Sequence, residues 1–180
     1  MYKHRLLFGL TAVGILMLSR SVLGRAVSPE DMATLRSNVV AWYTRGAPAT
    51  EAIHSYLRTM KPNGSWPDVD YENTDRGGWA TYQHLSRTLA MAQAYRKPGH
   101  ALAGDADLHA AIEKALGHWV EKDYRNKNWW YPEIGVPLAM APMLVLMGDE
   151  MQPELHDRAI RRILSRSKMG RTGQNKVWLA

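Results

Sequence analysis

The residues best suited to chemistry lie in three breaks between helical stretches of this 180-residue sequence. Each break contains aromatic, amide or acidic side chains where turn-forming residues alone would connect two helices. The breaks are residues 61–79, residues 123–133 and residues 169–176. Because loops positioned on a rigid scaffold often carry binding and catalytic residues, these segments are the candidate functional ones.

Three large rings are consecutive in the second break, at Trp129, Trp130 and Tyr131. Neighbouring side chains on a helix diverge by about 100°, so three in a row do not enter one core face. At least one ring is therefore expected in a cleft, where it could stack on the apolar C–H face of a pyranose. The alternative is that the rings close the end of the core. Asn128 beside them either hydrogen-bonds sugar hydroxyls or closes the turn as an Asx motif.

Four acids are candidates for glycoside hydrolysis, which needs two carboxylates at a defined separation. They are Asp68, Asp70, Asp75 and Glu133. An Asp-x-Asp pair in a Pro/Gly-rich loop more often caps helices and pairs with nearby cations, so we favour a structural role. The spacing and the glycine of a calcium loop are missing.

The seven histidines are scattered along the chain, without the spacing of a metal motif such as H-E-x-x-H. His84 directly follows the first break and could face a cleft, whereas His109 and His118 lie on the next helix. A lone helical histidine is usually a surface or a satisfied core residue. We predict neither a metal site nor a cofactor.

Apolar residues recur at three- and four-residue steps through most of the chain, and no segment alternates with period two. Unequal loops favour an α/α toroid, a ring of helical hairpins, over a simple bundle. The predicted fold is all-α, an incomplete α/α toroid of antiparallel hairpins. Because the last apolar run, 177–180, is too short for a stable helix, we interpret the chain as an N-terminal fragment. The predicted helices are 29–45, 53–60, 82–95, 105–119, 136–147 and 153–168.

Residues 1–24 have the pattern of a secretory signal peptide, with a basic start, an apolar stretch of about 13 residues and small residues before a cleavage site. The stretch is shorter than the roughly 20 residues that cross a bilayer, so we expect export to the periplasm or exterior and no stable membrane insertion. Without Lys3, Arg5 and Arg20 the net charge falls from +6 to +3. That surplus is compatible with an anionic ligand and does not indicate nucleic-acid binding.

Three stretches resemble polysaccharide lyase family 8, which contains chondroitin, hyaluronate and xanthan lyases. They are GSWPDVDY (64–71), NWWYPEIGVP (128–137) and MGRTGQNKV (169–177), in family order, and the resemblance covers residues 28–180. It implies that residues 25–180 are the first part of the toroid domain. By position alone Asn175 is a helix N-cap.

The resemblance also implies roles for particular residues. Asn128, Trp129 and Trp130 match the aromatic patch that holds the sugar chain, and Asn175 matches the asparagine that binds the uronate carboxylate. Gln174 departs from the alanine that commonly precedes this asparagine. No residue matches the family's histidine base and tyrosine acid.

We therefore expect the N-terminal portion of a lyase acting on an acidic polysaccharide by β-elimination, with negligible activity alone. Two alternatives are a non-catalytic glycan-binding module and an α/α-toroid glycoside hydrolase. The sequence does not select among chondroitin, hyaluronan and xanthan.

Overall fold

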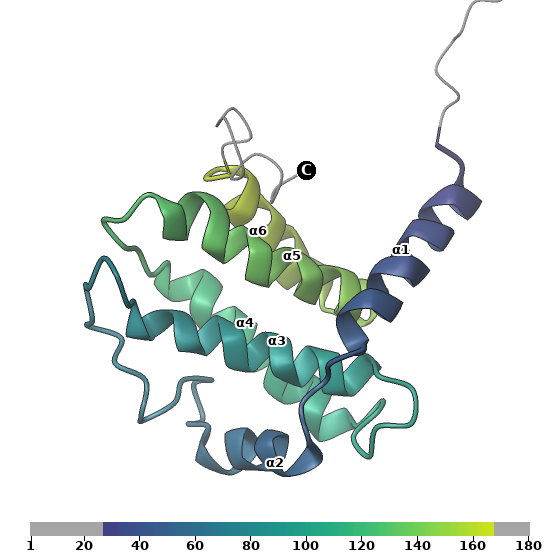
Figure 1. The fold of residues 1–180 in the computed structure, drawn as a ribbon, viewed down its shortest axis with the longest axis horizontal. Helices are drawn as coiled ribbons and strands as arrows, with labels where there is room; N and C mark the ends of the chain where they lie inside the picture. The colour runs from purple at the N-terminus through teal and green to yellow at the C-terminus, as the bar shows by residue number, and fades with distance from the viewer. Residues whose placement is uncertain (1–26, 168–180) are drawn as a thin grey trace, which may run out of the picture.

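Helices of the computed structural model, which describes residues 27–167, follow one another in antiparallel hairpins (Figure 1). No strand occurs within these residues, as predicted. Short 3-10 turns occupy Ala80–Tyr82 and Gly148–Glu150, and a π-helical turn, Tyr131–Gly135, leads directly into α5. The α-helices are α1 (Pro29–Thr44), α2 (Thr50–Thr59), α3 (Gln83–Arg96), α4 (Ala106–Lys122), α5 (Val136–Met147) and α6 (Pro153–Leu164).

Helix starts follow from local capping chemistry. The Ser28 hydroxyl accepts a hydrogen bond from the Asp31 N–H at 3.0 Å, and the Asp31 carboxylate accepts one from the Ser28 N–H at 3.0 Å. This reciprocal box satisfies two backbone donors that a helix start would otherwise leave unpaired. Asp105 caps α4 with a single bond, accepting from the Leu108 N–H at 2.8 Å. Serine and aspartate are both among the residues preferred at this position.

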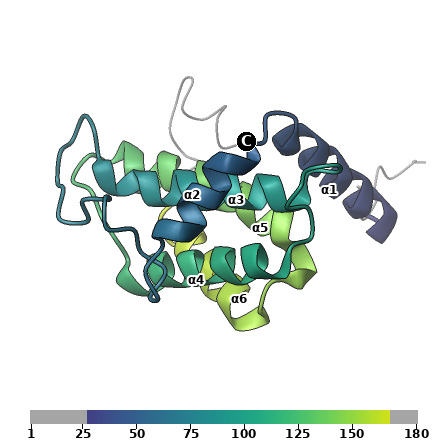
Figure 2. The same ribbon diagram turned by 90° about the horizontal axis from the view of Figure 1, so that it is seen from below.

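Four helices enclose the core. α3 packs on α4 and α5, and α6 packs on the same two helices from the other side. α2 packs on the outer side of α3, away from the other core helices. α1 contacts both α3 and α5 (Figures 1 and 2). The core side chains from α3, α4 and α5 are fully buried and include Leu85, Met91, Ile112, Leu116, Met140 and Met143.

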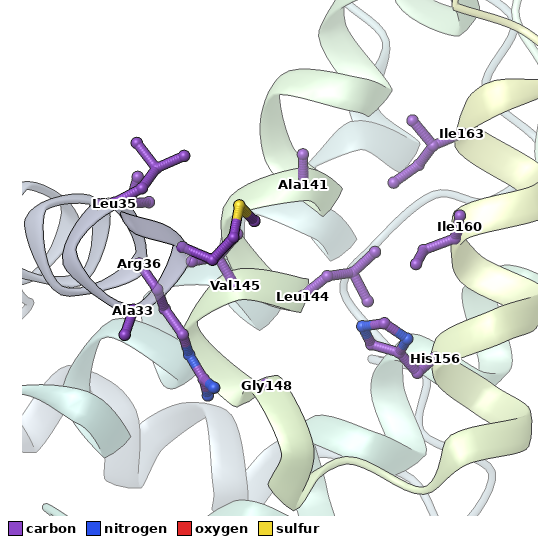
Figure 3. Close-up of a pocket in the computed structure, with 12 residues that line it drawn as sticks. Ala33, Leu35, Arg36, Ala141, Leu144, Val145, Gly148, His156, Ile160 and Ile163 are labelled. Carbon is purple, nitrogen blue, oxygen red and sulfur yellow. The ribbon is translucent and has the colours of Figure 1, made fainter. Parts of the chain in front are cut away.

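The apolar side chains of α1 are covered along only half the helix. Val40 and Tyr43 pack against the core, whereas Met32 and Leu35 are 53% and 55% exposed. The exposed half borders an apolar groove of about 580 Å³ between α1, α5 and α6 (Figure 3). Beside it, Arg36 on α1 pairs with Asp149 at 3.2 Å, after the end of α5.

The stretch Tyr131–Glu150 is the single helical segment of the described residues that is long and apolar enough to cross a membrane. It contains α5, and 67% of its apolar window is buried inside the fold. That burial is typical of the core helix of a globular domain.

A matched pair of leucine truncations tests this core. Leu116→Ala empties a fully buried site on α4, and we expect it to lower the free energy of unfolding by about 3 kcal/mol. Leu35→Ala makes the same chemical change on the exposed half of α1 and should cost less than about 1 kcal/mol. Urea unfolding followed by circular dichroism measures both. Equal losses would contradict the packing described above.

Candidate functional site

Two of the three sequence breaks meet at one end of the helices, where α4 ends and α5 begins (Figure 1). The Asn126 amide donates to the Asp75 carbonyl at 2.9 Å, and the Asn128 amide donates to the Arg76 carbonyl at 2.7 Å. These bonds hold residues 123–133 against residues 61–79. The third break, with the predicted site residue Asn175, lies outside the described residues.

The first break is itself pressed against α4. Gly64 has a φ of +84°, and a Cβ atom there would lie 2.4 Å from the Lys114 carbonyl oxygen. Only glycine permits both this backbone conformation and this approach. The Trp66 indole N–H donates to the Tyr56 carbonyl at 3.0 Å, which fastens the same loop to α2. The loop is therefore a fixed support for the second break.

Asn128 closes the turn, which was one of its two predicted roles. The side-chain oxygen of Asn128 accepts a hydrogen bond from the Trp130 backbone N–H at 3.1 Å. The backbone N–H of Asn128 donates to the Asn126 side-chain oxygen at 2.8 Å. An amide side chain has two donor hydrogens and two acceptor positions. Within the described residues these bonds, with the one to Arg76, engage one side-chain donor and one acceptor of Asn128.

The three consecutive rings diverge, as their spacing predicted. The Tyr131 hydroxyl accepts the Trp79 N–H at 3.1 Å, and its ring meets the Trp79 ring edge-on at 5.1 Å. Trp130 is partly buried and lies over Gly135, where a Cβ atom would come within 2.5 Å of the indole. Trp129 remains 39% exposed. The indoles of Trp129 and Trp130 are thus not enclosed in the core, and a π-helical turn, a feature frequent at functional sites, follows them.

His84 is fully buried, so the prediction that it could face a cleft is wrong. Its Nε2 lies 2.9 Å from the Ala115 carbonyl oxygen, which can only accept, so Nε2 carries the proton. Its Nδ1 then accepts from the Tyr71 hydroxyl at 2.9 Å. Burial lowers the pKa of His84 to about 3, and the ring is neutral at physiological pH.

His118 extends this arrangement to the second break. Its ring stacks on that of His84 at 5.5 Å, and its Nε2 lies 2.9 Å from the Tyr124 hydroxyl. Burial, with the nearby Lys122 charge, lowers the pKa of His118, and burial raises the pKa of Tyr124 to about 12. Tyr124 also stacks on Tyr71 at 5.0 Å, which joins the two breaks through partly buried rings.

We define the buried polar network as the buried His84 and His118 together with the partly buried Tyr71 and Tyr124. Sequence reasoning did not identify it as a unit, although helical spacing offered a signal. His84 recurs with the buried residues Thr88, Met91 and Tyr95 at steps of four, three and four residues. That period places His84 on the buried face of α3.

The aspartates of the first break have structural partners, as favoured from sequence. Asp68 forms a two-point ion pair with Arg87 at 2.8 and 2.6 Å, and this hydrogen bonding lowers the pKa of Asp68. Asp70 accepts the Glu72 N–H at 3.0 Å, and Asp75 accepts from the Asn73 amide at 3.1 Å. Among residues 27–167 no group of three histidine or acidic side chains is arranged to hold a metal ion.

Antiparallel helical hairpins with elaborate loops gathered at one end form part of an α/α toroid. Residues 29–176 match the family model described as polysaccharide lyase family 8, N-terminal alpha-helical domain. The chain belongs to polysaccharide lyase family 8.

Relatives and a solved structure agree with this assignment. The chain is 34% identical over 128 residues to chondroitinase-AC of Pedobacter heparinus and 30% identical over 134 residues to hyaluronate lyase of Thermasporomyces composti. Each alignment covers 69% of this chain, but only 18% and 17% of the two relatives. The chain thus spans less than a fifth of their length. A structure of chondroitinase AC lyase, from work on enzyme–oligosaccharide complexes, superposes with a TM-score of 0.72 at 28% identity, covering 82% of this chain and 23% of that one.

The buried polar network predicts acid sensitivity. Between pH 6.5 and 3 the unfolded chain protonates His84 and the folded chain does not, so stability falls as pH falls. From pH 7 to pH 5 we expect the free energy of unfolding to drop by about 2 kcal/mol through His84. Urea unfolding across this range measures the slope.

Two glutamine variants control that measurement. His84→Gln removes the titrating ring and should give a shallower slope, whereas His54→Gln alters a half-exposed histidine on α2 and should leave the slope unchanged. An unaltered slope in the His84 variant would show that His84 does not cause the acid sensitivity.

Proposed function

We propose that this chain is the sugar-binding part of a lyase that cleaves uronate-containing polysaccharides by β-elimination. The observation that carries the proposal is the exposed indole of Trp129 beside the partly buried Trp130, on a loop held by Asn126 and Asn128. A flat apolar face next to an amide suits a pyranose, which offers C–H faces and hydroxyls together. Family membership and the named relatives support an acidic polysaccharide as the ligand.

Asn175 has a defined task in this proposal. β-Elimination removes the C5 proton of a uronate and expels the oxygen at C4, and negative charge develops on the carboxylate as the proton leaves. A preorganised neutral donor such as the Asn175 amide stabilises that charge, and one such donor is typically worth about 3–4 kcal/mol. The asparagine thus acts on the carboxylate while Trp129 and Trp130 hold the sugar ring.

A base and an acid are also required, and we assign neither to this chain. The two histidines of the buried polar network are poor candidates, because both are held away from solvent in hydrogen bonds to core partners. The three aspartates of the first break do not support the glycoside hydrolase alternative, since each carboxylate is engaged within the loop or with Arg87. We further propose that residues 1–24 direct export, which would bring the protein to an extracellular polymer.

Tryptophan substitutions test the binding proposal. Trp129→Ala and Trp130→Ala should each weaken binding to hyaluronan or chondroitin about fivefold or more, which corresponds to about 1 kcal/mol of lost stacking. Titration calorimetry measures the affinity. Trp42→Ala is the matched control, because Trp42 is also exposed, at 63%, but lies on α1. This helix pairs with Asp149 beyond the C-terminal end of α5, whereas Trp129 and Trp130 precede its N-terminal end. If all three variants bind equally, the platform is not at Trp129 and Trp130.

A turnover measurement separates binding from catalysis. We expect the 180-residue chain alone to bind the polymer without cleaving it, because the proton-transfer groups are not among its matched residues. β-Elimination leaves an unsaturated uronate that absorbs in the ultraviolet, so absorbance during incubation with chondroitin, hyaluronan and xanthan gives the rate. Sustained formation of that product by the purified chain would contradict this expectation.

A further inference from the structure

Asp123 ends α4 in an unusual backbone conformation. Its φ of 55° and ψ of 44° place it in the left-handed region, and no other non-glycine residue of the described chain has a positive φ. Glycine is the usual residue at this position after a helix, because it has no Cβ to clash. Aspartate is one of the few other residues that adopt this conformation, and its carboxylate is engaged here.

Three arginines converge on the Asp123 carboxylate. Arg166 pairs with its Oδ1, and Arg162 and Arg125 each pair with its Oδ2 at 2.8 Å. Arg162 also donates to the Val120 carbonyl at 3.0 Å, near the end of α4. Burial alone would raise the pKa of Asp123, but hydrogen bonds from Arg166 and Arg125 outweigh it and lower that pKa. The carboxylate is only 21% exposed and is therefore screened less than a surface ion pair.

Asp123 connects two segments of the chain. On one side, Asp123 begins the loop that continues through Tyr124 and Asn126 to the two tryptophans. On the other side, Arg166 lies in the last described turn after α6, and Asn175 follows it by nine residues. We refer to Asp123 with Arg125, Arg162 and Arg166 as the Asp123 clamp.

We propose that Asp123 is a positioning residue for glycan binding, whose carboxylate ties the loop carrying Trp129 and Trp130 to the end of α6. The proposal rests on the proposed function and assigns no contact between Asp123 and the sugar. Local bonds at Asn126 and Asn128 fix the loop only to the first break, whereas the Asp123 clamp fixes it to α6.

Substitutions at Asp123 separate this role from simple helix capping. Asp123→Gly removes the carboxylate and at the same time relieves the left-handed backbone, whereas Asp123→Asn keeps the shape and removes the charge. Asp157→Asn is the matched control, since Asp157 is an exposed acid of α6 that faces Arg161 at 3.9 Å. Arg166→Gln removes a partner from the other side.

Three measurements are made on the full 180-residue chain: hyaluronan affinity by calorimetry, amide hydrogen exchange in residues 124–131 and 160–167, and thermal unfolding by circular dichroism. We expect both Asp123 variants and Arg166→Gln to bind about fivefold more weakly and to exchange faster in both segments. Asp157→Asn should match the unmodified chain. The double variant Asp123→Asn/Arg166→Gln should lose no more affinity than Asp123→Asn alone, because Arg166 acts through the carboxylate that Asp123→Asn already removes.

Unchanged affinity and unchanged exchange in Asp123→Gly would overturn the proposal. If only the unfolding temperature falls, Asp123 acts as a helix cap and not as a positioning residue. If the unmodified chain does not bind hyaluronan, chondroitin or xanthan, the proposed function fails instead. In that case the exchange rates in the two segments still decide whether the Asp123 clamp couples them.

Discussion

The hydrogen bonds at the ring of His84 are the constraint on which the site end of this domain depends. A buried imidazole needs a partner at each nitrogen, and here one partner belongs to α4 and the other to the loop before α3. The Tyr71 hydroxyl that satisfies His84 also accepts the Trp66 N–H at 3.0 Å. One buried ring thus joins a helix hairpin to a long loop that has no regular backbone bonding of its own.

The second loop is built on the first. Tyr124 stacks on Tyr71, and the side chains of Asn126 and Asn128 donate to carbonyls of residues 75 and 76. Each bond satisfies a polar backbone group that a loop would otherwise expose or bury at a cost. The position of Trp129 therefore depends on contacts that begin some 60 residues earlier in the chain, at Gly64 and Trp66.

The two histidines at this end of the domain have structural partners. They hydrogen-bond to Tyr71, Ala115 and Tyr124, and burial lowers the pKa of both rings. The charged residues nearby, Asp68 with Arg87 and Asp123 with its three arginines, are paired within the protein. Trp129 stays 39% exposed at this end of the domain, and the proposed sugar-binding role rests on that exposure.

Local chemistry in the sequence determined the helices, the caps at Ser28 and Asp105, the two long breaks and the divergence of the three rings, because each depends on neighbours a few residues apart. The family motifs determined the assignment to polysaccharide lyase family 8. Sequence alone placed His84 at a possible cleft and did not show which part of α1 would be covered. Only the tertiary structure decided these points, because the partner of His84 is Ala115 and the residues that cover α1 belong to α3 and α5. Such partners lie tens of residues away, and no local pattern specifies which of them a side chain will meet.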